Sequence, residues 1–197
     1  MSIGVLALQG AVQPHRKSFA AVGEQAVPVR TALEIQSCDG LVLPGGESTT
    51  LLNLIGHYGL WQPLIDFARS RPLWGVCAGA ILMARRVEGP AQPSLDIVPI
   101  SVQRNAYGRQ NESFIAPISL RLPGQAPLQQ EAVFIRAPVI REIGASCEIL
   151  AEHDQLPVAV QHGFHLITTF HPELSASPSL HRHFALLCQG GQARRMA

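Results

Sequence analysis

With 197 residues and a formal charge of +1, the chain is long enough to bury one large core and has no excess charge of either sign. Its lysines and arginines are dispersed, which argues against binding to nucleic acid or to an anionic membrane surface. No apolar run reaches the roughly 18 residues of a membrane span, and the N-terminus lacks the basic start of a signal peptide. We therefore expect a cytoplasmic protein with a single domain over residues 1–197.

The cysteines are spread along the chain and form no CxxC pair. This spacing argues against a disulfide framework and against a structural zinc site. The histidines show no strong metal-ligand spacing either, so we expect no bound metal. Each cysteine is by default a small buried hydrophobic side chain, and only one of them has neighbours that suggest chemistry. The four are Cys38, Cys77, Cys147 and Cys188.

Short apolar runs alternate with helical stretches in the first half of the chain. The helix after the first run has Pro14 near its first turn and Gly23 at its end, where these residues are favoured. Ser48 or Thr49 is placed to cap the helix after the third run. This alternation predicts a parallel sheet with helices on both faces. The predicted strands are Ile3–Leu8, Ala26–Arg30, Gly40–Leu43 and Leu73–Val76, with a further helical stretch at Trp61–Arg69.

From about Leu95 the pattern changes to short strand candidates separated by proline, glycine and polar residues. Some of them should form antiparallel hairpins, with a tight turn at Gln161–Gly163, and a helix from about Ser179 to Cys188 closes the chain. The whole predicts a three-layer α/β fold with a mostly parallel sheet and some antiparallel strands. The candidates are Ile97–Val102, Ile118–Leu122, Val133–Ile135, Glu148–Ala151, Val158–Gln161 and Leu166–Phe170.

Cys77 lies between an apolar strand and a helix in the pattern Gly75-x-Cys77-x-Gly79. This is the cysteine form of the nucleophile elbow, a sharp turn in which the two glycines remove side chains that would collide. The elbow holds the thiol at the carboxyl end of the sheet and at a helix N-terminus, which stabilises a thiolate. The amide of Ala78 is then placed to bind an oxyanion. The plain alternative is a buried structural cysteine in a tight turn.

His171-Pro172-Glu173 follows the last predicted strand. A histidine at this point lies at the sheet edge to which the elbow brings Cys77. Glu173 can bond the far nitrogen of the imidazole and fix its tautomer, which is the role of the third member of a catalytic triad. A surface loop could carry the same three residues, but together with the elbow they predict a triad of Cys77, His171 and Glu173.

Pro44-Gly45-Gly46-Glu47-Ser48 also comes directly after a predicted strand. Paired glycines let backbone N–H groups approach a ligand closely, and Gly46 could supply a second oxyanion donor. Glu47 and Ser48 could hold polar groups of a substrate. The alternative is a glycine-rich turn in which Ser48 only caps a helix.

Six short motifs follow one another along the chain: LQGAV, PGGEST, GVCAGA, QRNAYGRQ, VFIRAP and FHPE. In these motifs, in their order and over nearly its whole length, the chain resembles the glutaminase subunits of pyridoxal 5′-phosphate synthase, a branch of the class I glutamine amidotransferases. A CAG sequence with a distant HPE is typical of class I amidotransferases in general, and the other motifs narrow the resemblance to the vitamin B6 branch. One small departure is Ala80, where many relatives have leucine.

The resemblance implies a flavodoxin-like fold and hydrolysis of L-glutamine to L-glutamate and ammonia, with Cys77 as nucleophile and His171 and Glu173 completing the triad. It implies that Gln9 and Gly10 lie near the interface with the synthase subunit, in a large hetero-oligomer that uses the ammonia to make pyridoxal 5′-phosphate. The expected reaction, attack by a thiolate followed by hydrolysis, needs no metal or redox cofactor. The resemblance places the glutamine contacts at Gly46, Glu47, Ser48, Arg104, Ile135 and Arg136.

Other interpretations stay open. Cysteine peptidases and DJ-1-like hydrolases use the same elbow and histidine, although they would lack the pair of PGGEST and HPE. A non-catalytic subunit would be expected to have lost a member of the triad. An amidotransferase branch with another ammonia acceptor is the more serious alternative. From the residues alone, Arg104 and Arg136 could form surface salt bridges instead of binding a substrate carboxylate.

Overall fold

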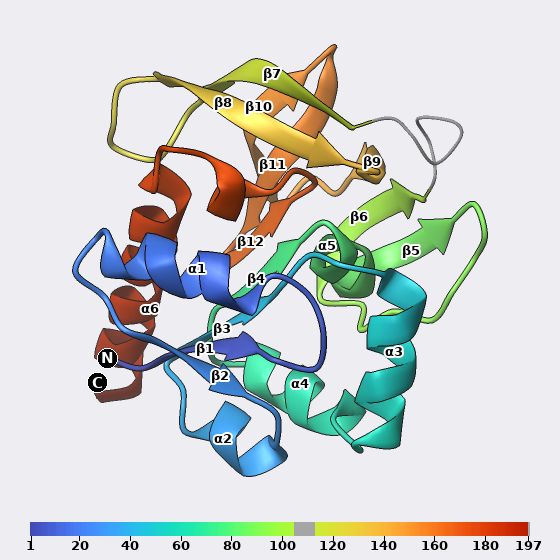
Figure 1. Ribbon diagram of the computed structural model, residues 1–197, viewed down its shortest axis with the longest axis vertical. Helices are drawn as coiled ribbons and strands as arrows, with labels where there is room; N and C mark the ends of the chain where they lie inside the picture. Colours follow the sequence, from blue (N-terminus) through green and yellow to red (C-terminus); the bar gives the residue numbers. More distant parts are fainter. Residues whose placement is uncertain (105–112, 197) are drawn as a thin grey trace.

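The computed structural model describes residues 1–104 and 113–196 of the chain. Its central element is a seven-stranded sheet in the order β10-β11-β12-β4-β3-β1-β2 (Figure 1). The five strands from β12 to β2 are parallel to one another. Beyond β12, β11 is antiparallel to β12 and β10 is antiparallel to β11. The predicted α/β class is confirmed. The strands are β1 (Ile3–Leu6), β2 (Ala26–Val29), β3 (Gly40–Leu43), β4 (Leu73–Val76), β10 (Cys147–His153), β11 (Leu156–His162) and β12 (His165–Thr168).

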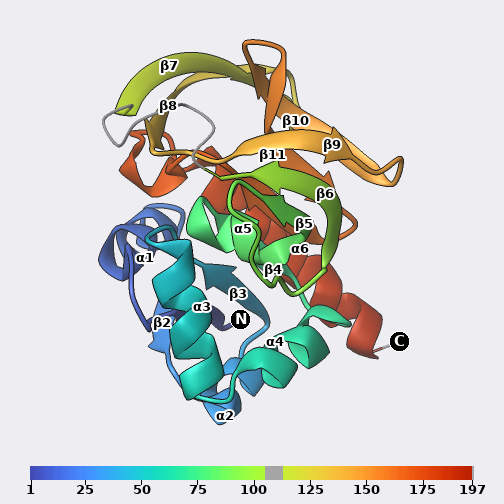
Figure 2. The same cartoon turned by 90° about the vertical axis from the view of Figure 1, so that its right-hand side faces the viewer.

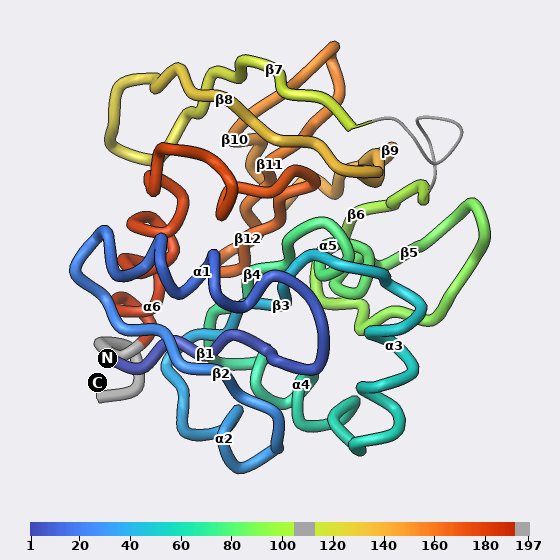
Figure 3. Tube along the Cα trace, in the orientation of Figure 1, coloured from blue at the N-terminus to red at the C-terminus, as the bar shows by residue number. Residues whose placement is uncertain are grey.

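Helices cover both faces of this sheet, because alternate strand residues point to opposite sides. Val42 and Trp74 pack into a core with α1 and α6, whereas Leu41, Leu43 and Leu73 pack into a second core with the other helices. The first and last helices, α1 and α6, lie side by side (Figure 3). The helices are α1 (Val12–Ala20), α2 (Ala32–Gln36), α3 (Ser48–His57), α4 (Trp61–Ala68), α5 (Ala78–Met83) and α6 (Ser179–Met196).

Two smaller sheets complete the structure. One has the order β5-β6-β9, and the other is an antiparallel ribbon of β7 and β8. Figure 2 shows the ribbon at the same end of the molecule as β9 and β10. None of the helices in the described ranges is both long enough and apolar enough to span a membrane. The strands are β5 (Ala84–Glu88), β6 (Val98–Gln103), β7 (Ser113–Leu120), β8 (Leu128–Ile135) and β9 (Val139–Ile143).

The strand predictions were accurate in the first half of the chain and less so in the second. Gly40–Leu43 and Leu73–Val76 match β3 and β4 residue for residue. The predicted strands Ile118–Leu122 and Val133–Ile135 were too short, because exposed residues alternate with buried ones along the β7–β8 ribbon. Strand β5 was missed because its Arg85-Arg86 pair faces solvent and leaves no apolar run, and β9 was missed as well.

Three local features also differ from the predictions. The turn between β11 and β12 lies at residues 163–164 instead of Gln161–Gly163, because Gly163 adopts a φ of +58° and His162 still pairs with β12. The last helix continues beyond Cys188 to Met196, through two glycines that would be expected to end it. Helix α2 was missed although Thr31 and Glu34 form a capping box at its start, a signal visible in the sequence.

Candidate active site

Three neighbouring parallel strands, β3, β4 and β12, bring the predicted site residues to one edge of the sheet. In the sheet register, Leu43 of β3 lies beside Gly75 of β4, and Thr168 of β12 lies beside Val76 of β4. The glycine-rich loop, the elbow and the histidine segment each follow one of these strands. They therefore meet at the carboxyl edge, where α/β sheets bind ligands.

Cys77 occupies a strained turn between β4 and α5. Its backbone angles are φ 48° and ψ −99°, a region that residues other than glycine rarely adopt. The Cys77 N–H donates to the Thr168 carbonyl at 2.8 Å and ties the elbow to β12. A Cβ on Gly75 would lie 2.7 Å from the Gly79 carbonyl group, and one on Gly79 would overlap the Leu43 carbonyl. The predicted collision across the turn is thus confirmed for Gly75, whereas Gly79 is needed because β3 approaches the elbow closely.

His171 and Glu173 lie on the segment after β12, which continues into the short helix η1 (Pro172–Leu174). His171 Nδ1 is 2.8 Å from Glu173 Oε1, and both side chains are buried. The backbone N–H of His171 donates to the Val133 carbonyl of β8 at 2.8 Å, so the ribbon fixes the position of the histidine. Because Nδ1 faces the carboxylate, the other ring nitrogen is left for a hydrogen bond with Cys77.

The charges of His171 and Glu173 stabilise each other. Burial alone would lower the pKa of His171, but hydrogen bonds with Cys77 and Glu173 and their negative charge raise it to about 10. Burial alone would raise the pKa of Glu173, but the hydrogen bond from His171 and the charge of nearby histidines bring it below its ordinary value. The geometry therefore favours an imidazolium at His171 and a carboxylate at Glu173, with Cys77 on the pocket side of the ring.

The loop after β3 packs against His171 on one side and Gln9 on the other. A Cβ on Gly45 would overlap the His171 ring. Gly46 has a φ of +151°, and a Cβ there would overlap the Gln9 side-chain amide. Gln9 Oε1 accepts the Glu47 N–H at 3.2 Å. Gln9, for which the family resemblance implies a position near a subunit interface, thus also supports the loop that carries the predicted oxyanion donor.

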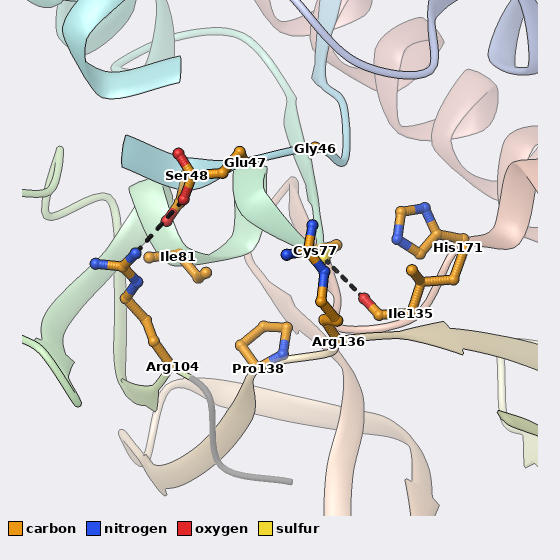
Figure 4. Close-up of a pocket in the computed structure, with 10 residues that line it drawn as sticks. All are labelled: Gly46, Glu47, Ser48, Cys77, Ile81, Arg104, Ile135, Arg136, Pro138 and His171. Atoms are coloured by element: carbon orange, nitrogen blue, oxygen red, sulfur yellow. Dashed lines mark hydrogen bonds and ion pairs between the residues drawn. The ribbon is translucent and has the colours of Figure 1, made fainter. Parts of the chain in front are cut away.

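A pocket opens in front of Cys77. It has a volume of about 130 Å³, below the roughly 300 Å³ of the smallest drug-sized sites, and therefore suits a small metabolite. In Figure 4, Cys77 lies between His171 and the group formed by Glu47, Ser48 and Arg104. All six predicted glutamine contacts line the pocket. Its walls are Gly46, Glu47, Ser48, Cys77, Ile81, Arg104, Ile135, Arg136, Pro138 and His171.

One end of the pocket is charged. Arg104 Nη2 lies 3.7 Å from Glu47 Oε1 and donates to Thr49 Oγ1 at 3.1 Å. The Glu47 carboxylate also accepts the Thr50 N–H at 2.6 Å and is the N-cap of α3. The prediction that Ser48 or Thr49 caps this helix was therefore wrong, because the longer Glu47 side chain reaches the same N–H groups. Despite some burial, the N–H groups of Thr50 and Thr49 hold the pKa of Glu47 below its ordinary value.

The remaining wall includes residues that the sequence did not single out. Ile81 follows Cys77 by one turn of α5, a spacing that could have indicated it, and Pro138 follows Arg136 by two residues. Arg136 has a φ of +45°, a sparsely populated conformation for a residue other than glycine. The buried Ser48 hydroxyl donates to the Gln92 side chain at 3.2 Å, a contact with no sequence signal.

Cys77 is the only one of the four cysteines on this pocket's wall, and its thiol donates to the Ile135 carbonyl at 3.9 Å. Cys38 and Cys188 are buried elsewhere in the two cores. In the described part of the chain, no three histidine, cysteine or acidic side chains are grouped as a metal site would require. Residues 105–110 of the predicted QRNAYGRQ motif lie outside the described residues.

Comparison with known proteins decides the family. Residues 5–189 match the SNO glutamine amidotransferase family. The chain belongs to this family. Related proteins called pyridoxal 5′-phosphate synthase subunit PdxT include that of Geobacillus thermodenitrificans, 47% identical over 93% of each chain. That of Deinococcus radiodurans is 47% identical over 93% of this chain and 95% of its own, and that of Desulforamulus reducens is 43% identical over 93% and 97%.

Solved structures agree with this family. One described as a glutamine amidotransferase superposes on this amidotransferase with a TM-score of 0.86 at 40% identity, covering 95% of this chain and 98% of its own. Another, described as a glutamine amidotransferase from Thermotoga maritima, has a TM-score of 0.60 at 12% identity, with 100% and 97% coverage, and shows the shared fold alone. Family membership argues against the peptidase and DJ-1-like interpretations of the elbow.

Proposed function

We propose that this amidotransferase is the glutaminase subunit of a pyridoxal 5′-phosphate synthase. It hydrolyses L-glutamine to L-glutamate and ammonia in the cytoplasm and passes the ammonia to the synthase subunit. The observation that carries the proposal is the meeting of Cys77 and His171 in one small pocket, with Glu173 hydrogen-bonded behind the imidazole. The names of the full-length relatives support the choice of partner.

The first half of the reaction forms a thioester. The Cys77 thiolate attacks the side-chain amide carbon of glutamine, and the N–H groups of Gly46 and Ala78 bind the negative oxygen. Ala78 is the first residue of α5, so its N–H has no acceptor within that helix. His171 gives its proton to the nitrogen as the C–N bond breaks, ammonia leaves, and a glutamyl thioester remains on Cys77.

The second half of the reaction uses water. His171, now neutral, takes a proton from a water molecule that attacks the thioester carbon. The C–S bond breaks, glutamate leaves, and the thiolate and imidazolium of Cys77 and His171 are restored. Glu173 keeps its proton-free form throughout and holds His171 in the tautomer that faces Cys77. Each of these steps is carried by side chains and backbone N–H groups of this chain.

Recognition of the amino-acid end of glutamine falls to the charged end of the pocket. The planar guanidinium of Arg104 matches a carboxylate, and Glu47 matches an ammonium group. These two side chains lie 3.7 Å apart, so a zwitterionic substrate can satisfy both charges at once. Ser48 and the backbones of Ile135 and Arg136 supply further polar groups on the wall. Glutamine then extends from this end to Cys77.

Delivery to a partner has a chemical reason. Free ammonia is mostly protonated at neutral pH and then is no nucleophile, so a sheltered path to the synthase preserves its reactivity. We assign the contact with the synthase, within a large hetero-oligomer, to the Gln9–Gly10 segment. Gly10 is exposed, and the Gln9 amide packs on Gly46 and bonds the Glu47 N–H. A partner at this segment would therefore lie next to the loop that holds the substrate.

The test is glutamate release from L-glutamine by the pure chain, with and without the synthase subunit. We expect release that rises when the synthase is added and disappears in Cys77→Ala. Cys147→Ala is a matched control, because Cys147 lies on β10 and away from the pocket. Release that survives Cys77→Ala would remove Cys77 from the mechanism. No release with the synthase present would contradict the proposed function.

A further inference from the structure

Behind the triad, Glu173 faces buried histidines that the proposed reaction does not use. We infer that His15 of α1 and His181 of α6 are positioning residues, which hold the Glu173 carboxylate through a chain of contacts from His181 to His15 to Glu173. This inference rests on the proposed triad, because Glu173 matters for catalysis only if it orients His171. It extends the line of interacting side chains from three residues to five.

The contacts join three elements that are distant in sequence. His15 Nδ1 lies 3.0 Å from His181 Nε2, and His15 Nε2 lies 3.6 Å from Glu173 Oε2. The other oxygen of the same carboxylate, Oε1, accepts from His171. Each oxygen of Glu173 therefore faces a different histidine, one towards the pocket and one towards the core. The side-by-side packing of α1 and α6 brings His15 and His181 together (Figure 3).

The carboxylate oxygen of Glu173 on the core side lacks a hydrogen-bond donor among the described residues. Glu173 Oε2 and His15 Nε2 are both buried, and neither has a hydrogen-bond partner among the described residues. A buried carboxylate oxygen without a donor is costly, and a buried ring nitrogen is as well. Because the two atoms face each other, a shift of about half an ångström would form a hydrogen bond that satisfies both.

The protonation states of the two histidines limit the direction in which hydrogen bonds can run from His181 through His15 to Glu173. Burial, with a smaller effect of His171, lowers the pKa of His15 to about 4 although Glu173 opposes it, and burial also lowers that of His181. Both rings are therefore neutral at neutral pH, with one donor and one acceptor nitrogen each. If His181 Nε2–H donates to His15 Nδ1, His15 Nε2–H points at the carboxylate. The opposite tautomer of His15 would direct a lone pair at Glu173.

Aromatic side chains enclose the pair of histidines. The Trp74 ring contacts His15 edge-on at a centroid distance of 5.6 Å and His181 at 4.8 Å, and the Phe19 ring lies 4.8 Å from His181. The Trp74 N–H donates to Thr168 Oγ1 at 3.2 Å and so does not compete for the histidines. Hydrogen bonds are stronger in such apolar surroundings than in water.

Among the described residues, the titratable groups that act on His15 are Glu173, His171 and His181. Removal of His15 leaves the buried Glu173 carboxylate with the support of His171 and of its own backbone N–H. Burial then raises the pKa of the carboxyl, and protonation sets in at a higher pH than in the native protein. A protonated Glu173 no longer holds the His171 imidazolium. In a variant without His15, activity should therefore begin to fall at a higher pH on the acid side of the pH profile.

Two substitutions separate a donor role from a packing role. Gln in place of His15 keeps an N–H donor near the position of Nε2, whereas Asn places its amide near Nδ1 and leaves Oε2 without a donor. We expect His15→Asn to lower kcat at least tenfold with little change in the KM for glutamine, and to move the acid limb of kcat/KM towards neutral pH. We expect His15→Gln to stay within about threefold of the native kcat. Activities are measured in the complex with the synthase subunit.

His183→Asn is the matched control, because His183 is a buried histidine on the same helix as His181 and bonds Gln161 instead of the triad. The melting temperature of each variant is measured alongside. Equal kcat and an unshifted pH profile in His15→Asn and His183→Asn would overturn the inference. The inference would also be overturned if the kcat values of His15→Gln and His15→Asn followed their melting temperatures instead of the position of the N–H donor.

A second readout separates this inference from the proposed function. The rate at which iodoacetamide alkylates Cys77 in the isolated chain is followed from pH 5 to pH 8 and needs neither glutamine nor the synthase. We expect the acid limb of this rate to move to higher pH in His15→Asn and not in His183→Asn. Such a shift supports the inference even if glutamine is not the substrate, whereas an unshifted rate in an active glutaminase contradicts the inference alone.

Discussion

The two sides of His171 differ in almost every physical property. In front lies an open pocket whose charged end is partly solvated, with the Glu47 side chain 46% exposed. Behind lies a sealed region in which the Glu173 and His15 side chains are both 0% exposed. The open side can bind and release a zwitterion, and the sealed side can hold one geometry without competition from water. Changes to the charged side chains in front should therefore alter binding, and changes that move His171 or the side chains behind it should alter turnover.

The largest effect should come from the sealed side. Glu173→Gln removes the negative charge behind His171. The new side-chain amide can also donate to His171 Nδ1, which favours the tautomer with its proton on the nitrogen that faces Cys77. We expect kcat to fall by roughly 10²–10⁴ with a KM within about threefold of native. The measurement is steady-state glutamate release in the synthase complex. Glu131→Gln, at an exposed position of β8, is the control. An equal kcat in the two variants would contradict the triad.

Gly45→Ala tests the contact between the front loop and the His171 ring. The new Cβ would overlap the ring, so the ring or the loop must move. We expect kcat to fall about tenfold to a hundredfold, because a displacement of about 1 Å can cost 10²-fold in rate. Gly56→Ala is the control, since a Cβ there meets nothing within 4 Å and should stabilise α3 by up to about 1 kcal/mol. Kinetics and thermal melting check both, and native kcat in Gly45→Ala would refute the contact.

A change at the charged end of the pocket should act on binding. Arg104→Ala leaves the substrate carboxylate without its partner and Glu47 without its ion pair. We expect the KM for glutamine to rise about tenfold or more, with kcat changed less than about threefold. Arg121→Ala is the control, because Arg121 pairs with Glu152 away from the pocket. A fall in kcat at unchanged KM would mean that the open side also sets the reacting geometry.

The effect that is smallest at neutral pH concerns stability in acid. Burial lowers the pKa of both His15 and His165 to about 4, below the ordinary 6.5, so the unfolded chain binds more protons between these values. The part of the stability that depends on these two histidines is therefore fully present above pH 6.5 and is lost as the pH drops towards 4, by roughly 1 kcal/mol per pH unit for each histidine.

His165→Asn should reduce this dependence on pH, because asparagine does not titrate yet can still accept the Leu73 N–H that His165 Nδ1 accepts. Urea unfolding at pH 7, 6 and 5 measures the slope. His57→Asn, at an exposed position, should leave the slope unchanged. An unaltered slope in His165→Asn would contradict the assignment of a buried, neutral histidine there.

The sequence predicted the parallel part of the sheet better than the antiparallel part, for a physical reason. Strands β3 and β4 are buried on both faces and appear as unbroken apolar runs such as Gly40–Leu43. The β7–β8 ribbon and β5 have exposed residues, so Arg85-Arg86 and similar polar positions interrupt the pattern. Long-range pairing, and not local preference, forms those strands.

The residues that meet at the pocket could be singled out from the sequence because glycine and proline motifs fix backbone geometry locally. The elbow around Cys77 and the HPE segment follow adjacent parallel strands, so their meeting could be inferred from chain order. Contacts between side chains of helices that are distant in sequence could not be inferred in this way. His15 and His181 are 166 residues apart, and nothing in the local sequence of either one indicates that the two rings touch.

The most direct test of the whole account is to identify the residue that forms the covalent bond with the substrate. The complex with the synthase subunit is treated with a diazoketone analogue of glutamine, and the modified peptide is located by mass spectrometry. We predict one adduct on Cys77, blocked by excess L-glutamine, with Cys38, Cys147 and Cys188 unmodified. An adduct on another cysteine, or equal labelling of Cys77→Ala, would contradict the assignment of Cys77 as the nucleophile.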